Sequence, residues 1–148
     1  MIVYRIARRR YVANDGEGAK RHGGRWNRKG TAIVYASQSL ALSLLEVVAN
    51  SFRVPMGLVA IEIEIPDDVS IHDLTASELP RAWASKIVSD RTRNIGTEWV
   101  HSGETAILSV PSSIIPRERN FLLNPAHKDF ARIKFQPPEP FRLDPRLK

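Results

Sequence analysis

The segment from residue 23 to residue 46, GGRWNRKGTAIVYASQSLALSLLE, brings together side chains that could carry chemistry. Arg25 follows two glycines, which let the backbone come close to a ligand. Its guanidinium is suited to bidentate hydrogen bonding with phosphate or carboxylate. Glu46 ends an almost wholly apolar stretch, where an isolated charge is too costly to bury. Its carboxylate is therefore either a structural partner of a neighbouring arginine or a group that faces a ligand hydroxyl or cation.

Two hydroxyl-bearing residues are further candidates. Tyr35 ends a short β-branched run, where a tyrosine is either part of the core or a stacking face with its hydroxyl in a pocket. Ser112 follows Pro111 in a loop, where its hydroxyl either makes a turn or points at a ligand. It lacks the G-x-S-x-G surroundings of a hydrolase serine. The nearby glycines have neither Walker A order nor the G-x-G-x-x-G spacing of a dinucleotide-binding loop.

Composition excludes several classes of protein. A chain of 148 residues with 43% hydrophobic and 26% charged residues fits one globular domain over residues 1–148. Cysteine is absent, which excludes a disulfide framework, and the four histidines lack metal-ligand spacing, so we expect no metal site. The apolar runs are too short to span a bilayer and the N-terminus lacks signal-peptide order, so we expect a cytoplasmic protein without membrane contact.

Positive charge is concentrated at the N-terminal end of the chain. Residues 1–30 carry a net charge of +7, and the remaining 118 residues carry −1. Such a segment is either a solvated basic edge or a surface for an anionic partner, such as nucleic acid, a nucleotide or an acidic protein. Aromatic residues are few and do not interleave with the basic ones, and no histidine pair suggests RNA cleavage. A nucleic-acid-binding or ribonuclease function is therefore an alternative with less support.

The elements that must position these residues follow no regular βαβ rhythm, which predicts an α+β fold. Leu58–Ile65 alternates isoleucine with glutamate at its end, and this alternation predicts a strand with one solvent-exposed face. Ser37 or Ser39 should cap a helix over Leu40–Asn50. Because this helix is apolar nearly all round, we expect it to be sandwiched inside the protein.

Other parts of the chain carry their own local signals. Thr75 and Glu78 fit a capping box that opens a short helix. The proline-rich tail over about 136–148 predicts either a poorly ordered end or a docking arm. The remaining predictions are strands over residues 1–7, 32–36, 105–110 and 131–135, a loop rich in glycine and charge over 14–24, and a helix over 95–101 that Gly103 stops.

Taken in order, the motifs GGRWN, VYAS, LLE, LSVPSS and ERNFLLNPAHKDF resemble the RES-domain toxins of bacterial type II (RES–Xre) toxin–antitoxin systems. The similarity covers the chain from about Tyr4 to about Phe130. The positions that match the family pattern are Arg25 with its glycines and the following Trp-Asn, Tyr35, Glu46 and Ser112, with Asn120 and Asn124-Pro125 in the C-terminal signature. The resemblance implies a compact α+β domain like that of ADP-ribosyltransferase toxins, with small mixed or antiparallel sheets, flanking helices and an NAD+ cleft between the sheets.

The resemblance also implies an activity and its residues. It implies a toxin that cleaves NAD+ at the nicotinamide–ribose bond, with water or phosphate as acceptor, and so arrests growth. Mono-ADP-ribosylation of a cellular protein is the alternative, and the acceptor stays open. The implied catalytic residues are Arg25, Tyr35, Glu46 and Ser112, and the implied NAD+-binding set adds Gly24, Trp26 and Asn27.

Partners follow from the same resemblance. It implies an Xre-type antitoxin that covers the active site and makes any DNA contact, so that the toxin itself binds no nucleic acid. NAD+ is the substrate in this interpretation, and no metal is required. A homodimer, the toxin-to-antitoxin stoichiometry and the role of the tail are left open.

Overall fold

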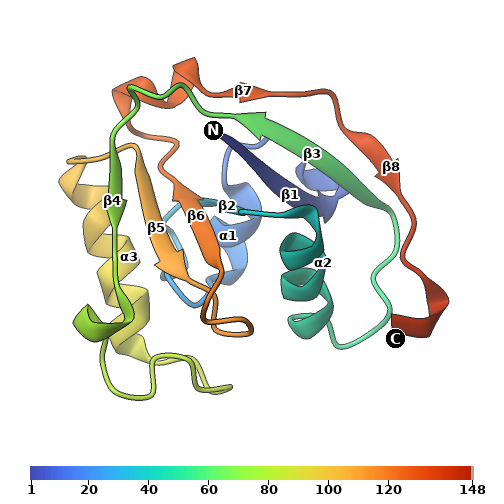
Figure 1. Cartoon of the computed structure of the whole chain (residues 1–148), viewed down its shortest axis with the longest axis horizontal. Helices are drawn as coiled ribbons and strands as arrows, with labels where there is room; N and C mark the ends of the chain where they lie inside the picture. Colours follow the sequence, from blue (N-terminus) through green and yellow to red (C-terminus); the bar gives the residue numbers. More distant parts are fainter. Residues whose placement is uncertain (148) are drawn as a thin grey trace.

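A single mixed sheet organises the computed structural model, which describes residues 1–147 (Figure 1). The strands among these residues are β1 (Ile2–Arg8), β2 (Val34–Ser37), β3 (Leu58–Glu64), β4 (Ile71–Asp73), β5 (Ile107–Pro111), β6 (Arg119–Leu123), β7 (Lys134–Phe135) and β8 (Glu139–Phe141). Their order is β4-β5-β6-β2-β1-β3-β7, and β8 also pairs with β3. The pairing is parallel between β4 and β5 and antiparallel between the other neighbours.

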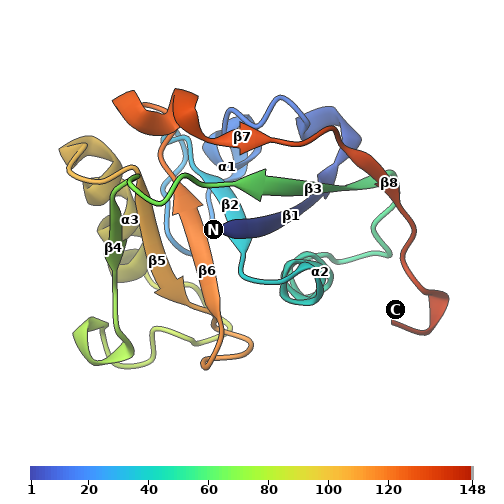
Figure 2. The ribbon, with the colours of Figure 1, turned by 45° about the horizontal axis from the view of Figure 1, so that its top comes forward.

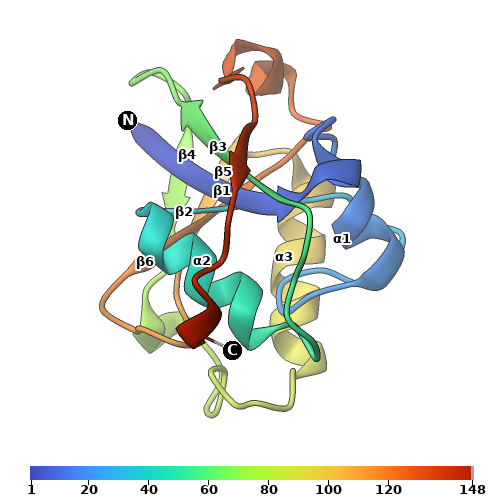
Figure 3. The same cartoon turned by 90° about the vertical axis from the view of Figure 1, so that its right-hand side faces the viewer.

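Three α-helices and four 3-10 turns accompany the strands within the described residues. The helices are α1 (Glu17–His22), α2 (Leu40–Ala49) and α3 (Asp90–Ser102), and the turns are η1 (Arg9–Tyr11), η2 (Ala76–Glu78), η3 (Lys128–Arg132) and η4 (Pro145–Leu147). Figures 1 and 2 show α2 next to β1, and it also contacts β2, whereas α3 lies at the opposite end of the sheet next to β4 and β5. Figure 2 shows α1 and α2 on opposite sides of β1, and in Figure 3 α2 lies at the left of the view and α1 at the right.

Strand pairing within the sheet is least extensive between β1 and β2. Within residues 1–147 these two strands share one register pair, Tyr4 with Ser37, whereas β1 and β3 pair along their whole length. Beyond that pair the two strands are not paired with each other, and side chains form hydrogen bonds with the backbone groups that the strands leave unpaired. The Ile6 N–H donates to Ser43 Oγ at 2.7 Å, and Arg5 Nη1 donates to the carbonyl of Tyr35 at 3.0 Å. The small sheets implied by the family resemblance are therefore two halves joined at Ser37.

Two hydrophobic cores lie against the sheet, and the first spans both halves, because it contains residues of β1, β2, β3, β5 and β6. Val3, Ile61 and Ile63 lie in the core beneath β1 and β3, and Glu62 and Glu64 point to solvent, which confirms the predicted alternation of this strand. The second core forms between α3 and the other half of the sheet, and its buried members are Trp26, Ile33, Leu74, Trp99, Leu108, Val110 and Leu122.

Contact between α3 and the glycine–arginine motif depends on a glycine. A Cβ at Gly96 would lie 1.8 Å from the carbonyl oxygen of Trp26, which leaves no room for a side chain. The absent side chain lets α3 lie directly on the backbone that precedes the predicted strand β2. The motif that carries Arg25 is thus packed against a helix rather than held by its own turn alone.

The prediction for α2 is confirmed at its start and wrong about its surroundings. Ser39 caps the helix, because its Oγ accepts from the N–H of Leu42 at 3.1 Å. Leu42 and Ser43 are buried, but Ala41 and Leu45 are exposed, so the helix is covered on one face and not sandwiched. Apolar residues on all sides of the helix did not mean that it is buried on all sides. The helix packs against β1 and β2 with one face, and its other face is exposed to solvent.

Helix predictions elsewhere need correction in two places. The stretch predicted as a loop over 14–24 contains α1, whose first turn is stabilised by the Glu17 N–H donating to Asp15 Oδ1 at 3.0 Å. The second predicted helix begins at Asp90 instead of residue 95, because Ser89 caps it through the N–H of Arg91. Its predicted stop at Gly103 is confirmed, with φ at 63°. The capping box of Thr75 and Glu78 is also present, around the short turn η2.

Several strands differ from the prediction as well. The strand expected over 32–36 lies at 34–37, and the one expected over 105–110 lies at 107–111 and runs through Pro111. Residues 131 and 132 belong to the turn η3, so the strand expected over 131–135 shrinks to β7. The short strands β4 and β6 were not predicted.

The proline-rich tail is docked on β3 as far as Phe141. Its strand β8 pairs with β3 from Leu58 to Ala60, and the N–H of Gln136 donates to the carbonyl of Glu62 at 2.9 Å. Of the two predicted alternatives, the docking arm is the one found, and the surface it covers is the outer edge of this chain's own sheet (Figure 1). Lys148 lies outside the described residues.

Candidate active site

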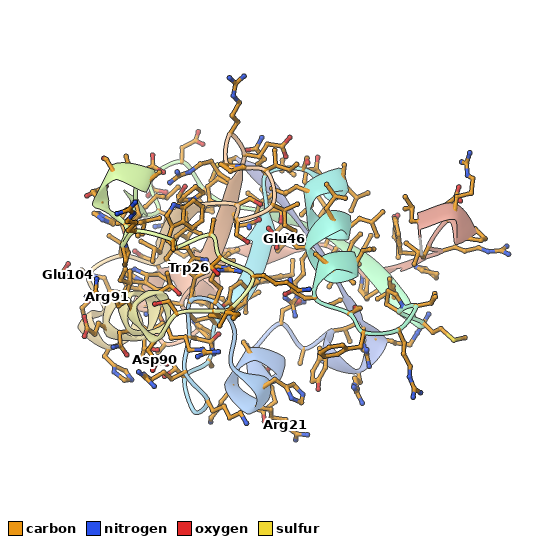
Figure 4. The ribbon with its side chains drawn as sticks, turned by 90° about the horizontal axis from the view of Figure 1, so that it is seen from below. Arg21, Trp26, Glu46, Asp90, Arg91 and Glu104 are labelled. Carbon is orange, nitrogen blue, oxygen red and sulfur yellow. The ribbon has the colours of Figure 1, made fainter. Side chains whose placement is uncertain are left out.

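The carboxylate of Glu46 is held by donors from two other elements. Ser112, directly after β5, donates its hydroxyl proton to Oε1 at 2.9 Å. Asn120, on β6, donates from Nδ2 to the same oxygen at 2.6 Å. Figure 4 shows the Glu46 side chain leaving α2 on the side that faces Trp26. Three segments that are distant in sequence therefore meet at one carboxylate oxygen.

The second oxygen of Glu46 is presented outward. Within residues 1–147, both side-chain donors to Glu46 use Oε1, and Oε2 receives no protein hydrogen bond. Oε2 is not among the buried polar atoms of this region that lack a partner, so it is open to solvent. Glu46 thus combines one fixed oxygen with one free acceptor in a partly buried position.

Ser112 is completely engaged by the protein. Its side chain is buried, and its Oγ accepts from the backbone N–H groups of Ile114 and Ile115, both at 3.1 Å, while its proton goes to Glu46. A hydroxyl has one proton and two lone pairs, and all three are in use. In this arrangement Ser112 positions Glu46, and its hydroxyl has no further donor or acceptor for a ligand.

Arg25 lies within electrostatic reach of Glu46. Its Nη1 donates to the carbonyl oxygens of Trp83 at 2.8 Å and Ser85 at 3.0 Å, in the loop that precedes α3. Burial lowers the pKa of Arg25, and the nearby carboxylate of Glu46 acts in the opposite direction. A guanidinium has five N–H donors, so most of them remain for an anionic ligand.

The turn around Arg25 is closed by Tyr35. The Tyr35 hydroxyl donates to Asn27 Oδ1 at 2.6 Å and lies 3.3 Å from the backbone N–H of Trp26, which donates to it. A Cβ at Gly24 would lie 2.9 Å from this hydroxyl, so the position requires glycine for space. Burial raises the pKa of Tyr35, which keeps the phenol neutral.

Two of the predicted NAD+-binding residues are structural neighbours of the site. Trp26 is buried in the second core, with its ring centroid 6.4 Å from that of Trp83. Asn27 is 0% exposed, and its Nδ2 donates to the carbonyl oxygens of Ala19 and Thr31. The structure therefore brings Arg25 and Glu46 together with their supports, and it places these two side chains behind the turn.

Sequence reasoning did not include Asn120 or Ser37 in the site. Asn120 was noted as part of a C-terminal signature, and Ser37 was considered as a helix cap. In the structure they face each other across β2 and β6, and Ser37 Oγ donates to Asn120 Oδ1 at 2.7 Å. The asparagine within the ERNF motif was the available signal, but its partner depended on a strand that was not predicted.

Two surface hollows lie near the basic N-terminal segment. One of about 450 Å³ is lined by His22, Gly23, Asn27, Arg28, Lys29 and Arg93. The other, of about 230 Å³, is lined by Arg10, Tyr11, Ala13, Asp15, Glu17 and Arg21. Glu46 lines neither of them, so its free oxygen opens to the surface outside these hollows.

Across residues 1–147, no group of three or more histidine, aspartate or glutamate residues is placed to hold a metal ion. In that part of the chain, no helix has both the length and the apolar character that a membrane crossing requires.

The sequence and the fold of this chain both have counterparts among known proteins. The model of the RES domain family matches residues 2–144, and the chain belongs to this family of toxins. A "Prs ADP-ribosylating toxin" of Sphingobium sp. (strain YBL2) is 43% identical over 145 residues, which cover 94% of this chain and 90% of that protein. A "Toxin Res" of Yersinia enterocolitica is 41% identical and covers 100% of both chains.

A solved structure shows the same fold at low sequence identity. A chain in the crystal structure of the M. tuberculosis MbcT-MbcA toxin-antitoxin complex superposes with a TM-score of 0.77 at 16% identity. The match covers 95% of this chain and 83% of that chain, which confirms the predicted α+β class.

Proposed function

We propose that this RES-domain toxin cleaves NAD+ at the bond between nicotinamide and ribose and thereby removes NAD+ from the cytoplasm of the cell that makes it. The observation that carries the proposal is the carboxylate of Glu46, with one oxygen fixed by two donors, the other left free, and Arg25 within electrostatic range. Membership of the RES family and the printed name of a 43% identical relative, an ADP-ribosylating toxin, support an NAD+-using reaction.

The chemistry suits a single carboxylate. When the C–N bond to ribose breaks, its electron pair stays on the ring nitrogen, so the cationic pyridinium leaves as neutral nicotinamide. Positive charge then develops at the anomeric carbon, as it does in glycoside hydrolysis. Oε2 of Glu46 stabilises this charge, directly or through the ribose hydroxyls, in surroundings of low dielectric. A neutral leaving group makes a strong general acid unnecessary.

Other residues act on binding and geometry in this proposal. Arg25 pairs with the diphosphate through the N–H groups that the loop carbonyls leave free. The ring of Tyr35 lies against the nicotinamide, while its hydroxyl is used to hold the turn. Ser112 holds Glu46 and does not touch the substrate. Gly24, Trp26 and Asn27 contribute by keeping the turn that presents Arg25.

A protein acceptor is the alternative with a specific observation behind it. The Sphingobium relative is named for ADP-ribosylation of Prs. Water, phosphate and a protein side chain would each attack the same anomeric carbon with an electron pair; water and a protein side chain also release a proton to solvent, whereas a phosphate oxyanion need not. The first step and its residues are therefore common to all three outcomes.

A partner protein is part of the proposal. The structural neighbour comes from a toxin-antitoxin complex, and we propose an Xre-type antitoxin that covers Glu46 and makes the DNA contact. Leu45, next to Glu46 on α2, is 40% exposed and would be covered by the same partner. The basic segment does not demand nucleic acid, since Arg5, Arg21 and Arg28 already bond to groups of this chain.

The test is incubation of the purified protein with NAD+, with and without phosphate, followed by identification of the products by mass. We expect nicotinamide to be released in a mixture free of nucleic acid and of any other protein. The mass of the second product then identifies water or phosphate as acceptor. Bound NAD+ without nicotinamide release over hours contradicts the proposal and favours a binding module. RNA affinity that falls steeply with salt favours the ribonuclease alternative.

A further inference from the structure

We propose that Asn120 is a positioning residue for Glu46 and that Ser37 anchors it, an inference that rests on the proposed NAD+ cleavage. Asn120 donates to Glu46 Oε1 at 2.6 Å, the shorter of the two side-chain hydrogen bonds to this carboxylate. Its other end is bonded as well, because Ser37 donates to Asn120 Oδ1 at 2.7 Å. The three side chains form a chain of hydrogen bonds that ends at the carboxylate.

The direction of this chain is fixed by the carboxylate. An ionised carboxylate accepts hydrogen bonds and donates none, so the amide must present its NH2 group to Glu46. Its carbonyl oxygen then points the other way and needs a donor. The Ser37 hydroxyl supplies that donor, and it is 3% exposed, which shields this bond from water. Without Ser37 the amide loses the contact that keeps it aligned.

Asn120 is attached to a strand that is paired on both sides. Strand β6 lies between β5 and β2, and Asn120 is opposite Val110 on one side and Ser37 on the other. Ser37 is in turn the residue through which β2 pairs with β1, so the hydrogen-bond chain starts at the junction of the two half-sheets. A group held from strands is placed more accurately than one held from a loop, as Ser112 is.

Both donors use the same oxygen, and this has a consequence for catalysis. The fixed Oε1 sets the plane of the carboxylate and leaves Oε2 as the oxygen that meets the anomeric carbon. A displacement of about 1 Å can lower a rate by about 100-fold. Asn120 does not contact the substrate in this proposal, so its loss should change kcat and leave KM nearly unaltered.

The experiment compares nicotinamide release by Asn120→Ala, Asn120→Asp, Ser37→Ala and the matched control Asn124→Ala. Asn124 is also a buried asparagine next to β6, but it bonds to Val100 and Ala126 and not to Glu46. We expect Asn120→Ala to lower kcat by about 10- to 100-fold with KM within about threefold. Ser37→Ala should lower kcat by about three- to tenfold, because Asn120 keeps its own hydrogen bond to Glu46.

Asn120→Asp separates positioning from space filling. Aspartate has nearly the shape of asparagine but offers no N–H, and it places a second carboxylate against Oε1. If Asn120 positions Glu46, Asn120→Asp is slower than Asn120→Ala. If Asn120 merely fills space, the aspartate variant is the faster of the two, and the inference is overturned.

Controls distinguish this inference from the proposed function and from misfolding. Thermal unfolding of each variant is measured, and Asn124→Ala should lower stability while kcat stays near the wild-type value. If Glu46→Gln inactivates the protein but the Asn120 variants have the same kcat as Asn124→Ala, the inference about Asn120 is overturned and the proposed function is not. Wild-type protein without nicotinamide release overturns the proposed function and the inference with it.

Discussion

The Glu46 side and the Arg25 side of the candidate active site are built by different means. Glu46 is held by side-chain donors, one of which stands on the central strand β6. Arg25 is held by backbone carbonyls of Trp83 and Ser85, in a loop between η2 and α3. The carboxylate is thus tied to the sheet, and the guanidinium is tied to a connecting segment.

This difference predicts a division of labour. A group fixed by the sheet can hold a charge at a defined place in the transition state, which affects kcat. A guanidinium that shares its donors between loop carbonyls and a ligand can gain or lose anion contacts, which affects binding. Substitutions on the two sides should therefore separate the effects on kcat and KM.

The largest effect is expected from Glu46→Gln. Glutamine keeps the size of the side chain and can still bond to Ser112, but it cannot stabilise positive charge at the anomeric carbon. We expect kcat for nicotinamide release to fall by about 100- to 1,000-fold with little change in KM.

A matched control for Glu46→Gln is Glu104→Gln. Figure 4 shows Glu104 at the edge of the molecule remote from Glu46, and its side chain is exposed. This variant should retain the wild-type rate. A Glu46→Gln protein that cleaves NAD+ as fast as wild type removes the carboxylate from the mechanism.

An intermediate effect is expected from Arg25→Lys. Lysine keeps the charge, but its compact ammonium cannot bond to two loop carbonyls and also offer a planar pair of donors to a diphosphate. We expect KM for NAD+ to rise by about tenfold and kcat to change by less than about threefold.

The control for Arg25→Lys is Arg91→Lys on the exposed face of α3 (Figure 4). It should leave both constants unchanged. An Arg25→Lys variant that loses kcat while its KM stays constant contradicts the division of labour, because Arg25 would then act in the transition state.

Much of the fold could be predicted because its signals are local. The alternation in Leu58–Glu64 and the cap at Ser39 each lie within a few residues of the element that they define. Strand β4 gave no such signal, since its three residues are all exposed and its place is set by parallel pairing with β5. The same holds for α1, a short helix with glycine and charge that depends on its surroundings.

The site shows the same limit more clearly. Types and order of residues, through the family resemblance, predicted Arg25 and Glu46 as residues of the site. What holds Glu46 could not be predicted, because its donors lie 66 and 74 positions away and meet it through the register of β6. Burial of Trp26 behind the turn also required the packing of α3, and burial of Asn27 required the carbonyls of Ala19 and Thr31, which no short motif encodes.

The smallest effect on activity is expected from Tyr35→Phe, which tests whether the turn acts through stability. The phenol ring remains as a stacking face, but Asn27 Oδ1 loses its 2.6 Å donor in a residue that is 0% exposed. An unpaired buried acceptor destabilises a protein by about 1–3 kcal/mol, so we expect a loss of this size in the free energy of unfolding measured in urea. Nicotinamide release should fall by less than about threefold.

Tyr11→Phe is the matched control, because the Tyr11 hydroxyl is 3.3 Å from His22 Nε2 at an exposed position. It should change neither stability nor rate. If Tyr35→Phe instead loses activity by tenfold or more while its unfolding curve is unaltered, the hydroxyl acts on the substrate. The turn would then take part in the reaction directly, and the contrast between a catalytic Glu46 side and a binding Arg25 side would no longer hold.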